Sequence, residues 1–309
     1  MEKGGMLAVF GPTAVGKTAL VVALAEQLRA IGHEPVAISA DALAVYREIP
    51  ILTGAPTSVQ RDVLDHRLVG IRSVVEEFSA GEFADLAHAE IDSAIASGRS
   101  PIVVGGTGLY LRAAVSRLNL RPPVAEAIRA KWQRALVQQG APALHSRLTE
   151  LDPVTAARIE QEDGRRVTRA LELIESGQQP PLPSNGLWQA SPRVPTVAVG
   201  LLREPAEHRD RVARRARAIF DGGGREEVLR AESLGPSATA RAAIGWSELL
   251  AGDLDALTSR TWQLVRRQRT WMRKMRDVAQ LDVTGLDDAA AAELLLGHLE
   301  RTTAVQPRS

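Results

Sequence analysis

The stretch Gly11-Pro12-Thr13-Ala14-Val15-Gly16-Lys17-Thr18 directly follows the apolar run Met6-Leu7-Ala8-Val9-Phe10 and opens an amphipathic segment. A phosphate-binding loop occupies this place, between a strand and a helix. Its glycines let successive backbone N–H groups and a helix N-terminus face an anion, while the Lys17 ammonium reaches terminal phosphates and the Thr18 hydroxyl can ligate Mg²⁺. A chance glycine-rich turn would not carry the full pattern together with both flanks. The protein is therefore expected to bind a phosphorylated substrate through this loop.

The composition indicates a soluble protein of a reducing compartment. The 309 residues suffice for one large or two ordinary domains, and cysteine is absent, so no disulfide or thiolate metal site can form. The N-terminus lacks the apolar segment of a signal peptide, and no apolar run has the length of a membrane span. The formal net charge is +1, and the cations are nearly all arginines, a bias that a GC-rich genome explains first. We expect a cytoplasmic protein without membrane association.

Strands and helices alternate in the first third of the chain. Glu34–Ser39 and Pro101–Val104 have the apolar character of buried strands, and Lys17–Ile31 and Ala84–Ser97 have helical patterns. This alternation predicts an α/β fold: a P-loop core built on a parallel sheet with helices on both of its faces.

The strand signal disappears between residues 119 and 178. Helices are expected at Val124–Gln139, after Asp152-Pro153 and at Arg165–Ser176, and the turn-forming segment Gln179–Gly186 closes this part. The chain then returns to strand at Thr196–Leu202. Four further helices are expected at Pro205–Phe220, Arg225–Ser233, Ala238–Leu250 and Leu254–Arg276.

The core is thus expected to be discontinuous. Residues 1–118 and 193–285 would form it, residues 119–192 would be an all-helical insertion domain, and residues 286–309 would be a C-terminal helix and tail.

Two residues besides the loop follow strands directly, where ligands gather in open α/β sheets. Asp41 comes after the second strand and could ligate Mg²⁺ through water or act as a general base; capping a helix N-terminus is the equal alternative. Thr107 stands in Gly105-Gly106-Thr107-Gly108, whose glycines permit close approach of a ligand, although an ordinary strand-to-helix turn has the same letters. The strand Ile102–Val104 runs into glycine rather than into an acidic residue, which disfavours ordinary ATP hydrolysis.

Taken together, these residues resemble the bacterial tRNA dimethylallyltransferase family, of which this chain looks like a divergent member. The resemblance runs from about Leu7 to Arg276. The similar blocks are Gly11–Thr18, Ser39-Ala-Asp41 with Val45-Tyr-Arg47, Asp65–Leu68, Phe78-Ser79, Pro101–Tyr110, Asp152-Pro153, Arg165-Arg166 with Arg169–Glu172, Ala243–Gly245, and Arg266–Gln268 before Thr270-Trp271.

The resemblance implies transfer of a dimethylallyl group from dimethylallyl diphosphate to N6 of the adenine on the 3′ side of the tRNA anticodon, with Mg²⁺ as cofactor. The loop from Gly11 to Thr18 would hold the diphosphate, Lys17 and Mg²⁺ at Thr18 would stabilise its charge, and Asp41 would accept a proton from the amine. Thr107 would hydrogen-bond at the reacting centre. A monomer is expected.

Arginines would then bind the anticodon stem-loop through its phosphates, while the adenine swings out of its stack. For each candidate a solvated helix face is the alternative. The candidates are Arg165, Arg166 and Arg169 in the insertion and Arg266, Arg267, Gln268 and Arg273 near the C-terminus.

The chain departs from the family pattern at four places. Ala42 and Ala44 stand where polar residues are typical, Ala55 replaces a lysine, and Trp262 replaces an arginine expected near the diphosphate. Arg260 or Arg266, close along the same expected helix, could offset that last loss, or the chemistry could have changed.

Three interpretations therefore stay open. One is an active tRNA prenyltransferase, the second a prenyltransferase or kinase acting on free nucleotides, and the third an RNA-binding relative without turnover. The Lys17, Thr18, Asp41 and Thr107 side chains speak against the third, and the insertion has no purpose for the second.

Overall fold

The computed structural model describes residues 4–118, 124–180, 191–275 and 278–305. The chain divides into two compact units, one made of Met1–Leu118 with Ala190–Ser309 and the other of Asn119–Gln189. We call them the core unit and the helical unit. Among the described residues, no helix has both the length and the apolar composition needed to cross a bilayer.

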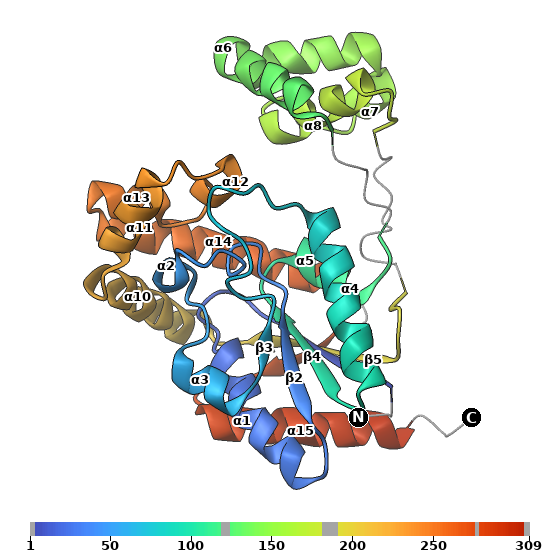
Figure 1. Cartoon of the computed structure of the whole chain (residues 1–309), viewed down its shortest axis with the longest axis vertical. Helices are drawn as coiled ribbons and strands as arrows, with labels where there is room; N and C mark the ends of the chain where they lie inside the picture. Colours follow the sequence, from blue (N-terminus) through green and yellow to red (C-terminus); the bar gives the residue numbers. More distant parts are fainter. Residues whose placement is uncertain (1–3, 119–123, 181–190, 276–277, 306–309) are drawn as a thin grey trace. The chain divides into compact units, whose positions relative to one another are not determined.

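A six-stranded parallel sheet organises the core unit, in the order β3-β2-β4-β1-β5-β6 (Figure 1). The central strand β1 pairs with β4 and with β5, so that Leu7 stands opposite Ile102 on one side and Val197 on the other. The parallel sheet predicted from the sequence is confirmed. The strands are β1 Met6–Phe10, β2 Pro35–Ser39, β3 His66–Arg67, β4 Ser100–Gly105, β5 Thr196–Leu202 and β6 Ala279–Asp282.

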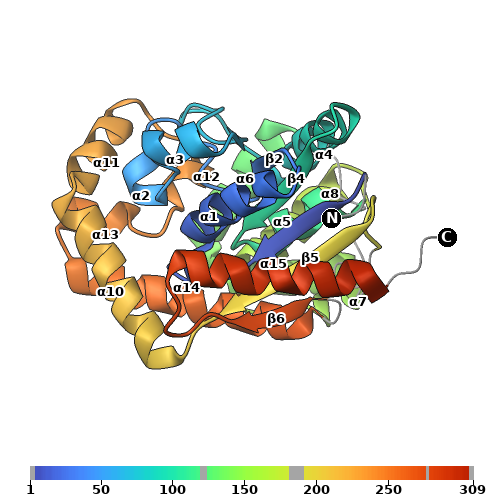
Figure 2. The same ribbon diagram turned by 90° about the horizontal axis from the view of Figure 1, so that it is seen from below.

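Helices cover both faces of this sheet, as the sequence predicts. The helices α1 and α15 pack on one face, where Leu7 and Val9 of β1 join Leu24 and Leu295 in a buried cluster (Figure 2). The helices α4 and α5 pack on the other face, as right-handed crossovers require. The helices of the core unit are α1 Lys17–Ala30, α2 Pro50–Thr53, α3 Ser58–Val63, α4 Ala80–Ala96, α5 Gly108–Val115, α10 Pro205–Asp221, α11 Gly224–Ser233, α12 Ala238–Arg241, α13 Trp246–Ala251, α14 Leu254–Lys274 and α15 Asp288–Val305.

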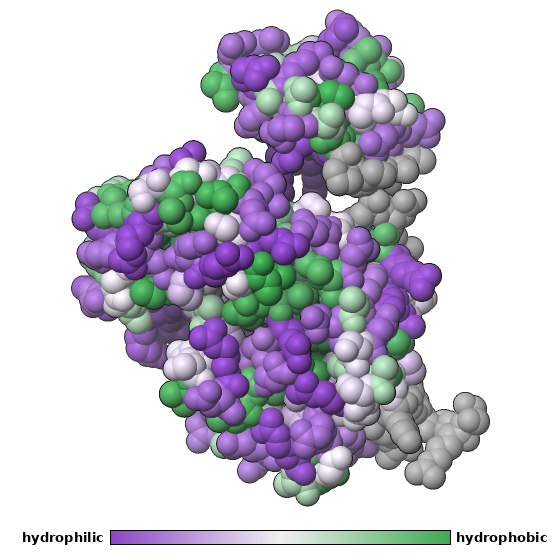
Figure 3. Space-filling model, viewed as in Figure 1, coloured by the Kyte–Doolittle hydropathy of each residue, from purple (hydrophilic) through white to green (hydrophobic). Residues whose placement is uncertain are grey.

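The helical unit consists of α6 Glu126–Leu151, α7 Pro153–Ala156 and α8 Gly164–Glu175. Leu144 and Leu148 of α6 pack against Val167 and Leu171 of α8 to form its small core. The helix α6 continues beyond the expected end at Gln139 because the chain resumes helical geometry after a break at Gly140, whose φ is 80°. Hydrophilic side chains cover most of the surface of this unit in the view of Figure 3.

Short elements at the edges of the core unit escaped the sequence analysis. The edge strands β3 and β6 have two and four residues, too few for a periodic pattern. The expected helix Ala238–Leu250 is two helices, since Gly245 adopts a left-handed conformation with φ 103° and starts α13 anew.

Candidate active site

The loop between β1 and α1, the P-loop below, curls around the start of a helix. Gly16 precedes α1 with φ 108°, and Ala14 also has a positive φ, of 65°. A positive φ is uncommon for a residue with a side chain and marks a backbone shaped for close approach.

Several N–H groups of the P-loop are left for a ligand. The N–H of Val15 donates to the Pro12 carbonyl at 3.3 Å, and that of Thr13 donates to Gln268 Oε1 at 2.9 Å. Within the described part of the chain, no hydrogen bond engages the N–H groups of residues 14, 16, 17 and 18. Together with the N-terminus of α1, they form an anion-binding site.

Three side chains hold the carbonyl groups of the same loop from behind. His208 Nε2 donates to the Thr13 carbonyl at 2.8 Å, and Arg211 Nε donates to that of Ala14 at 3.0 Å. Arg203 Nε donates to the Val15 carbonyl at 2.9 Å. In a trans peptide the C=O and the following N–H point in opposite directions, so these bonds turn the N–H groups of residues 14 and 16 away from α10. None of the three is predicted from the sequence, although Arg203 follows β5 directly; His208 and Arg211 lie on α10.

Lys17 lies inside this site. Its ammonium donates to the carbonyls of Gly11 at 2.8 Å and Pro12 at 3.0 Å. Burial lowers the pKa of Lys17 to about 8, with Asp41 raising it and Arg215 lowering it further. The lysine is thus poised to exchange backbone carbonyls for phosphate oxygens.

Asp41 uses one carboxylate oxygen to hold its own loop. Oδ1 accepts the N–H groups of Leu43 at 2.9 Å and Ala44 at 3.3 Å, which is the bonding of an Asx turn rather than of a helix cap. Oδ2 makes no hydrogen bond with a described residue. The carboxylate is close enough to Lys17 and Arg215 to affect the pKa of both.

The loop after β4 lies against the P-loop. A Cβ on Gly106 would stand 2.7 Å from Gln268 Nε2 and 3.0 Å from the Gly11 carbonyl oxygen, so a side chain there would displace Gln268. Thr107 is the N-cap of α5, and its hydroxyl makes no capping bond. Its hydroxyl makes no hydrogen bond with a residue that the structure describes, and it lies at the N-terminus of α5, directly after Gly106.

Gln268 differs from the expectation that it contacts tRNA. It is 3% exposed, and its amide joins the two loops by accepting from Thr13 N–H and donating to the Gly106 carbonyl at 2.8 Å. Gln268 belongs to the buried stripe of α14 together with Thr261 and Val265, whereas the two arginines directly before it are exposed.

Arg215 lies near Asp41 and near Lys17, whose pKa it helps to lower, and it is not predicted from the sequence. We call the P-loop together with Lys17, Asp41 and Thr107 the inner site. Arg215 Nη2 donates to the Thr53 carbonyl at 2.8 Å. Burial lowers the pKa of this arginine and Asp41 raises it. Gly54 makes room for it, since a Cβ there would meet the guanidinium at 2.3 Å. Among the many arginines of α10, nothing in the sequence distinguishes this one.

Trp262 packs against His208, the residue that donates to the Thr13 carbonyl of the P-loop. Its indole is half-buried, with the His208 ring packed edge to face at a centroid distance of 5.9 Å. Of the two arginines expected to offset the missing one, Arg260 pairs with Glu248 at 2.5 Å, whereas Arg266 is exposed and borders a cavity together with Trp262.

The residues fit a divalent cation held mainly by the ligand itself. No group of three His, Cys, Asp or Glu side chains that could hold a metal occurs in the described ranges. The hydroxyl of Thr18, in the first turn of α1, and the Oδ2 atom of Asp41 are the side-chain oxygens that could ligate a metal ion at this site. Mg²⁺ commonly takes one or two protein oxygens and completes its shell with phosphates and water.

With this geometry in view, the relatives of the chain can be compared. The family model for IPP transferase matches residues 44–275. The chain belongs to the IPP transferase family. A tRNA dimethylallyltransferase of Saccharopolyspora erythraea is 38% identical over 90% of this chain and 91% of its own length. One from Nocardia farcinica is 35% identical over 98% of both chains. The crystal structure of the tRNA isopentenylpyrophosphate transferase of Bacillus halodurans is 32% identical, has a TM-score of 0.67 and is matched over 98% of this chain and 99% of that one.

The family predicted from the sequence is thereby confirmed, and the chain is a member of a family of transferases. The arginines expected to bind RNA belong to both units. On α8 of the helical unit, Arg165 and Arg166 are exposed, and Arg169 pairs with Glu172 at 3.1 Å. On α14 of the core unit, Arg266, Arg267 and Arg273 are exposed.

Proposed function

We propose that this member of the IPP transferase family transfers a dimethylallyl group from dimethylallyl diphosphate to N6 of the adenine on the 3′ side of the anticodon in tRNA. One observation carries the proposal: the free N–H groups of the P-loop, the buried Lys17 and the carboxylate of Asp41 meet at one edge of the sheet. In the reaction, a bond forms between N6 and C1 of the dimethylallyl group, the bond from C1 to the diphosphate oxygen breaks, and N6 loses a proton.

The P-loop side serves the leaving group. Negative charge grows on the diphosphate as the C–O bond breaks, and Lys17, the N–H groups of residues 14, 16, 17 and 18, and the Thr107 hydroxyl are positioned to stabilise it. Because the carbonyl side of the loop is already bonded to Arg203, His208 and Arg211, the donors need little reorganisation when the charge develops. The Thr18 hydroxyl would hold Mg²⁺, which neutralises part of that charge.

Asp41 serves the acceptor. Its Oδ2 is free to take the proton from the exocyclic amine, while Oδ1 keeps the carboxylate oriented through Leu43 and Ala44. Such general-base catalysis contributes about 10²–10⁴-fold. Ala42 and Ala44, which stand in place of polar residues, leave the nucleobase fewer hydrogen-bonding partners from this loop.

Exposed arginines of both units, on α8 and α14, supply contacts for the RNA phosphates. The relatives carry tRNA in their names, which favours RNA over a free nucleotide as acceptor and favours turnover over binding alone. We expect the protein to act in the cytoplasm, where tRNA is modified, and as a monomer.

Mass spectrometry of tRNA nucleosides tests the function. A strain lacking this gene should lack N6-dimethylallyl adenosine and its derivatives, and the wild-type gene should restore them while the gene for Asp41→Asn should not. Unchanged nucleosides in the deletion strain would contradict the proposal.

A further inference from the structure

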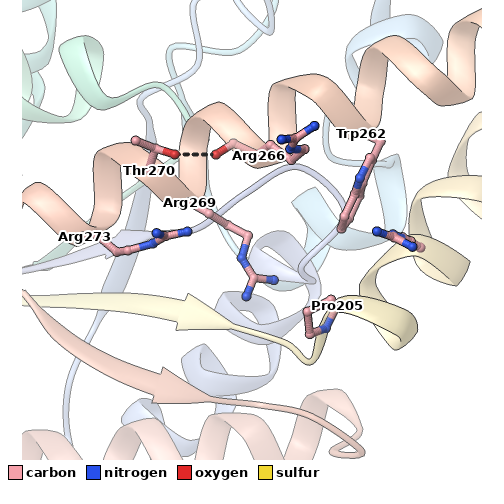
Figure 4. A pocket seen from close by; sticks show the side chains of 7 residues that line it. Pro205, Trp262, Arg266, Arg269, Thr270 and Arg273 are labelled. Carbon is pink, nitrogen blue, oxygen red and sulfur yellow. Dashed lines mark hydrogen bonds between the residues drawn. The ribbon is translucent and has the colours of Figure 1, made fainter.

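A second concave site lies on the outer side of the P-loop carbonyls, between the start of α10 and the exposed side of α14. It is a cavity of about 570 Å³. Figure 4 shows Trp262, Arg266, Arg269 and Arg273 around one space, with the guanidinium groups of Arg266 and Arg269 on the same side of the indole ring. The full lining is Pro205, Arg209, Trp262, Arg266, Arg269, Thr270 and Arg273. We call it the Trp262 pocket; it contains none of the residues that bind the leaving group or the amine.

The sequence builds this pocket as one stripe of α14. Trp262, Arg266, Arg269 and Arg273 follow one another at intervals of four, three and four residues, which places them along one side of a helix. Gln268, which binds Thr13 of the P-loop, belongs to the neighbouring buried stripe with Val265. The Trp262 stripe is turned from that buried stripe by one residue, about 100° around the helix.

The positive charge of the pocket favours binding of an anion. Its lining contains four guanidinium groups and no carboxylate. None of the ion pairs within the described ranges involves Arg209, Arg266, Arg269 or Arg273. One of them, Arg269, donates to the Arg203 carbonyl at 3.1 Å and so has a fixed position. Unpaired guanidinium groups gathered at one place are suited to phosphate oxygens.

The aromatic side of the pocket suits a base. The guanidinium of Arg209 lies over the Trp262 ring, 5.0 Å from its centroid, and Arg209 itself is exposed. A cation–π contact at an exposed site is weak, so a nucleobase can take this place and stack on the indole. His208 packs edge to face against the indole and so restricts its orientation.

The charged stripe is long enough to follow a strand. Arg273 comes seven positions after Arg266, which corresponds to about 10 Å along the helix. Successive phosphates of a nucleic-acid strand can lie along a stripe of this length.

We propose that the Trp262 pocket binds an unpaired nucleotide of the RNA substrate, with its base stacked on Trp262 and the flanking phosphates on Arg266 and Arg273. The choice of RNA rests on the proposed function. The nucleotide is not the reacting adenine, because Asp41 follows β2 whereas the pocket begins at Pro205 after β5, and β1, which leads into the P-loop, lies between these two strands in the sheet.

A double-mutant cycle between protein and RNA tests the proposal. The probes are a synthetic anticodon stem-loop with adenine 3′ to the anticodon and a series of the same hairpins, each lacking one loop base. Trp262→Ala should weaken binding of the intact hairpin by about 5- to 150-fold, the equivalent of one base stack at 1.4 kcal/mol per factor of ten, and Trp262→Phe should restore most of it. One abasic hairpin should bind the wild type more weakly than the intact hairpin does, by the same factor. Trp262→Ala should bind that abasic hairpin and the intact one equally well. The proposal would be overturned if Trp262→Ala weakened the binding of every hairpin by the same factor, or if it weakened the binding of none.

Two arginine variants supply the charge test and its control. Arg273→Ala should reduce the slope of log affinity against log salt by about 0.7, the value for one single-strand phosphate. Arg301→Ala removes an exposed arginine from α15, far along the chain from the pocket, and should leave the slope unchanged. If Trp262→Ala fails to fold, Trp262→Phe and Arg273→Ala still decide, since wild-type affinity and slope in Arg273→Ala would contradict the proposal.

Steady-state kinetics distinguish RNA binding at the Trp262 pocket from binding of dimethylallyl diphosphate there. A raised KM for dimethylallyl diphosphate in Trp262→Phe and Arg273→Ala, at unchanged hairpin affinity, would assign the pocket to the free diphosphate and overturn the proposal. If the wild type transfers no prenyl group to any tRNA, the proposed function is wrong. The double-mutant cycle still tests the binding of a nucleotide to the Trp262 pocket, because it measures affinity and not transfer.

Discussion

The arginines behind the P-loop and the arginines on the outside of α14 share one chemistry and differ in surroundings. Arg203 is 3% exposed, and its guanidinium donates to the Val15 carbonyl, the Leu286 carbonyl and Glu207. Arg266 and Arg267 are exposed and have no ion pair with a described residue. A guanidinium in which each of the three nitrogens donates to the protein holds the backbone in place, whereas an exposed one without such partners is available to a ligand. We therefore expect substitutions in the two groups to change different measurements.

The largest expected difference is between the effects of Lys17→Ala and Arg267→Ala on catalysis and on tRNA binding. Lys17→Ala should lower kcat/KM for dimethylallyl diphosphate by about 10²–10³-fold, the effect of removing one donor to a developing negative charge, and leave tRNA affinity nearly unchanged. Arg267→Ala should do the reverse, with weaker tRNA binding and normal use of the diphosphate. Steady-state kinetics and RNA titrations on variants with wild-type circular dichroism measure both. If the two substitutions behave alike, inner and outer cations do not have separate tasks.

Urea unfolding sharpens the same comparison in terms of stability. Arg203→Ala should cost about 1–3 kcal/mol of unfolding free energy, because it leaves the buried Val15 carbonyl without its donor and removes the partner of the half-buried Glu207. Arg266→Ala should stay within about 0.5 kcal/mol of the wild type, as is usual for an exposed position. A loss below about 1 kcal/mol for Arg203→Ala would mean that the loop does not depend on it.

The pH dependence follows from Lys17. Its pKa of about 8 means that the ammonium is charged in the free enzyme below pH 8 and loses its proton as the pH rises through that value. A plot of kcat/KM for dimethylallyl diphosphate should therefore fall above about pH 8, where an ordinary lysine would keep it level to about pH 10. The arginine in Lys17→Arg stays protonated, so this variant should lose the fall even if its activity is lower. A fall that persists in Lys17→Arg would assign it to another group.

The helical unit is expected to affect RNA binding and not the rate of transfer. Arg165→Ala with Arg166→Ala should lower the salt slope of tRNA binding by about one unit for each phosphate contact removed, with unchanged kcat at saturating tRNA. Arg301→Ala serves again as the matched loss of an exposed arginine. Identical slopes in the wild type and the double variant would leave the RNA contacts to the core unit.

How much the sequence predicts depends on the range of the interaction. The P-loop, Asp41 and Thr107 can be singled out as candidates because their pattern is local: each follows a strand within a recognisable motif, and the sheet brings strand ends together. Arg203, His208, Arg211 and Arg215 were missed because their partners are more than 150 residues away in the chain.

Gln268 shows where a better reading of the sequence was available. It was grouped with Arg266 and Arg267 because the three are adjacent, yet adjacent residues on a helix face different directions. Thr261, Val265, Gln268 and Met272 recur at intervals of four, three and four residues, which is the buried stripe of α14. The stripe that holds Trp262 has the same spacing, but only the structure shows that it encloses a pocket.

Single-turnover transfer by Asp41→Asn tests the inner site most directly. Purified enzyme in excess, isotopically labelled dimethylallyl diphosphate, Mg²⁺ and tRNA with adenine 3′ to the anticodon give the rate, and mass spectrometry identifies the labelled nucleoside. The wild type should yield N6-dimethylallyl adenosine, and Asp41→Asn should yield it at least about 10²-fold more slowly with unchanged tRNA affinity. A rate within a few-fold of the wild type, or label on another atom of the tRNA, would contradict the assignment of Asp41 as the base.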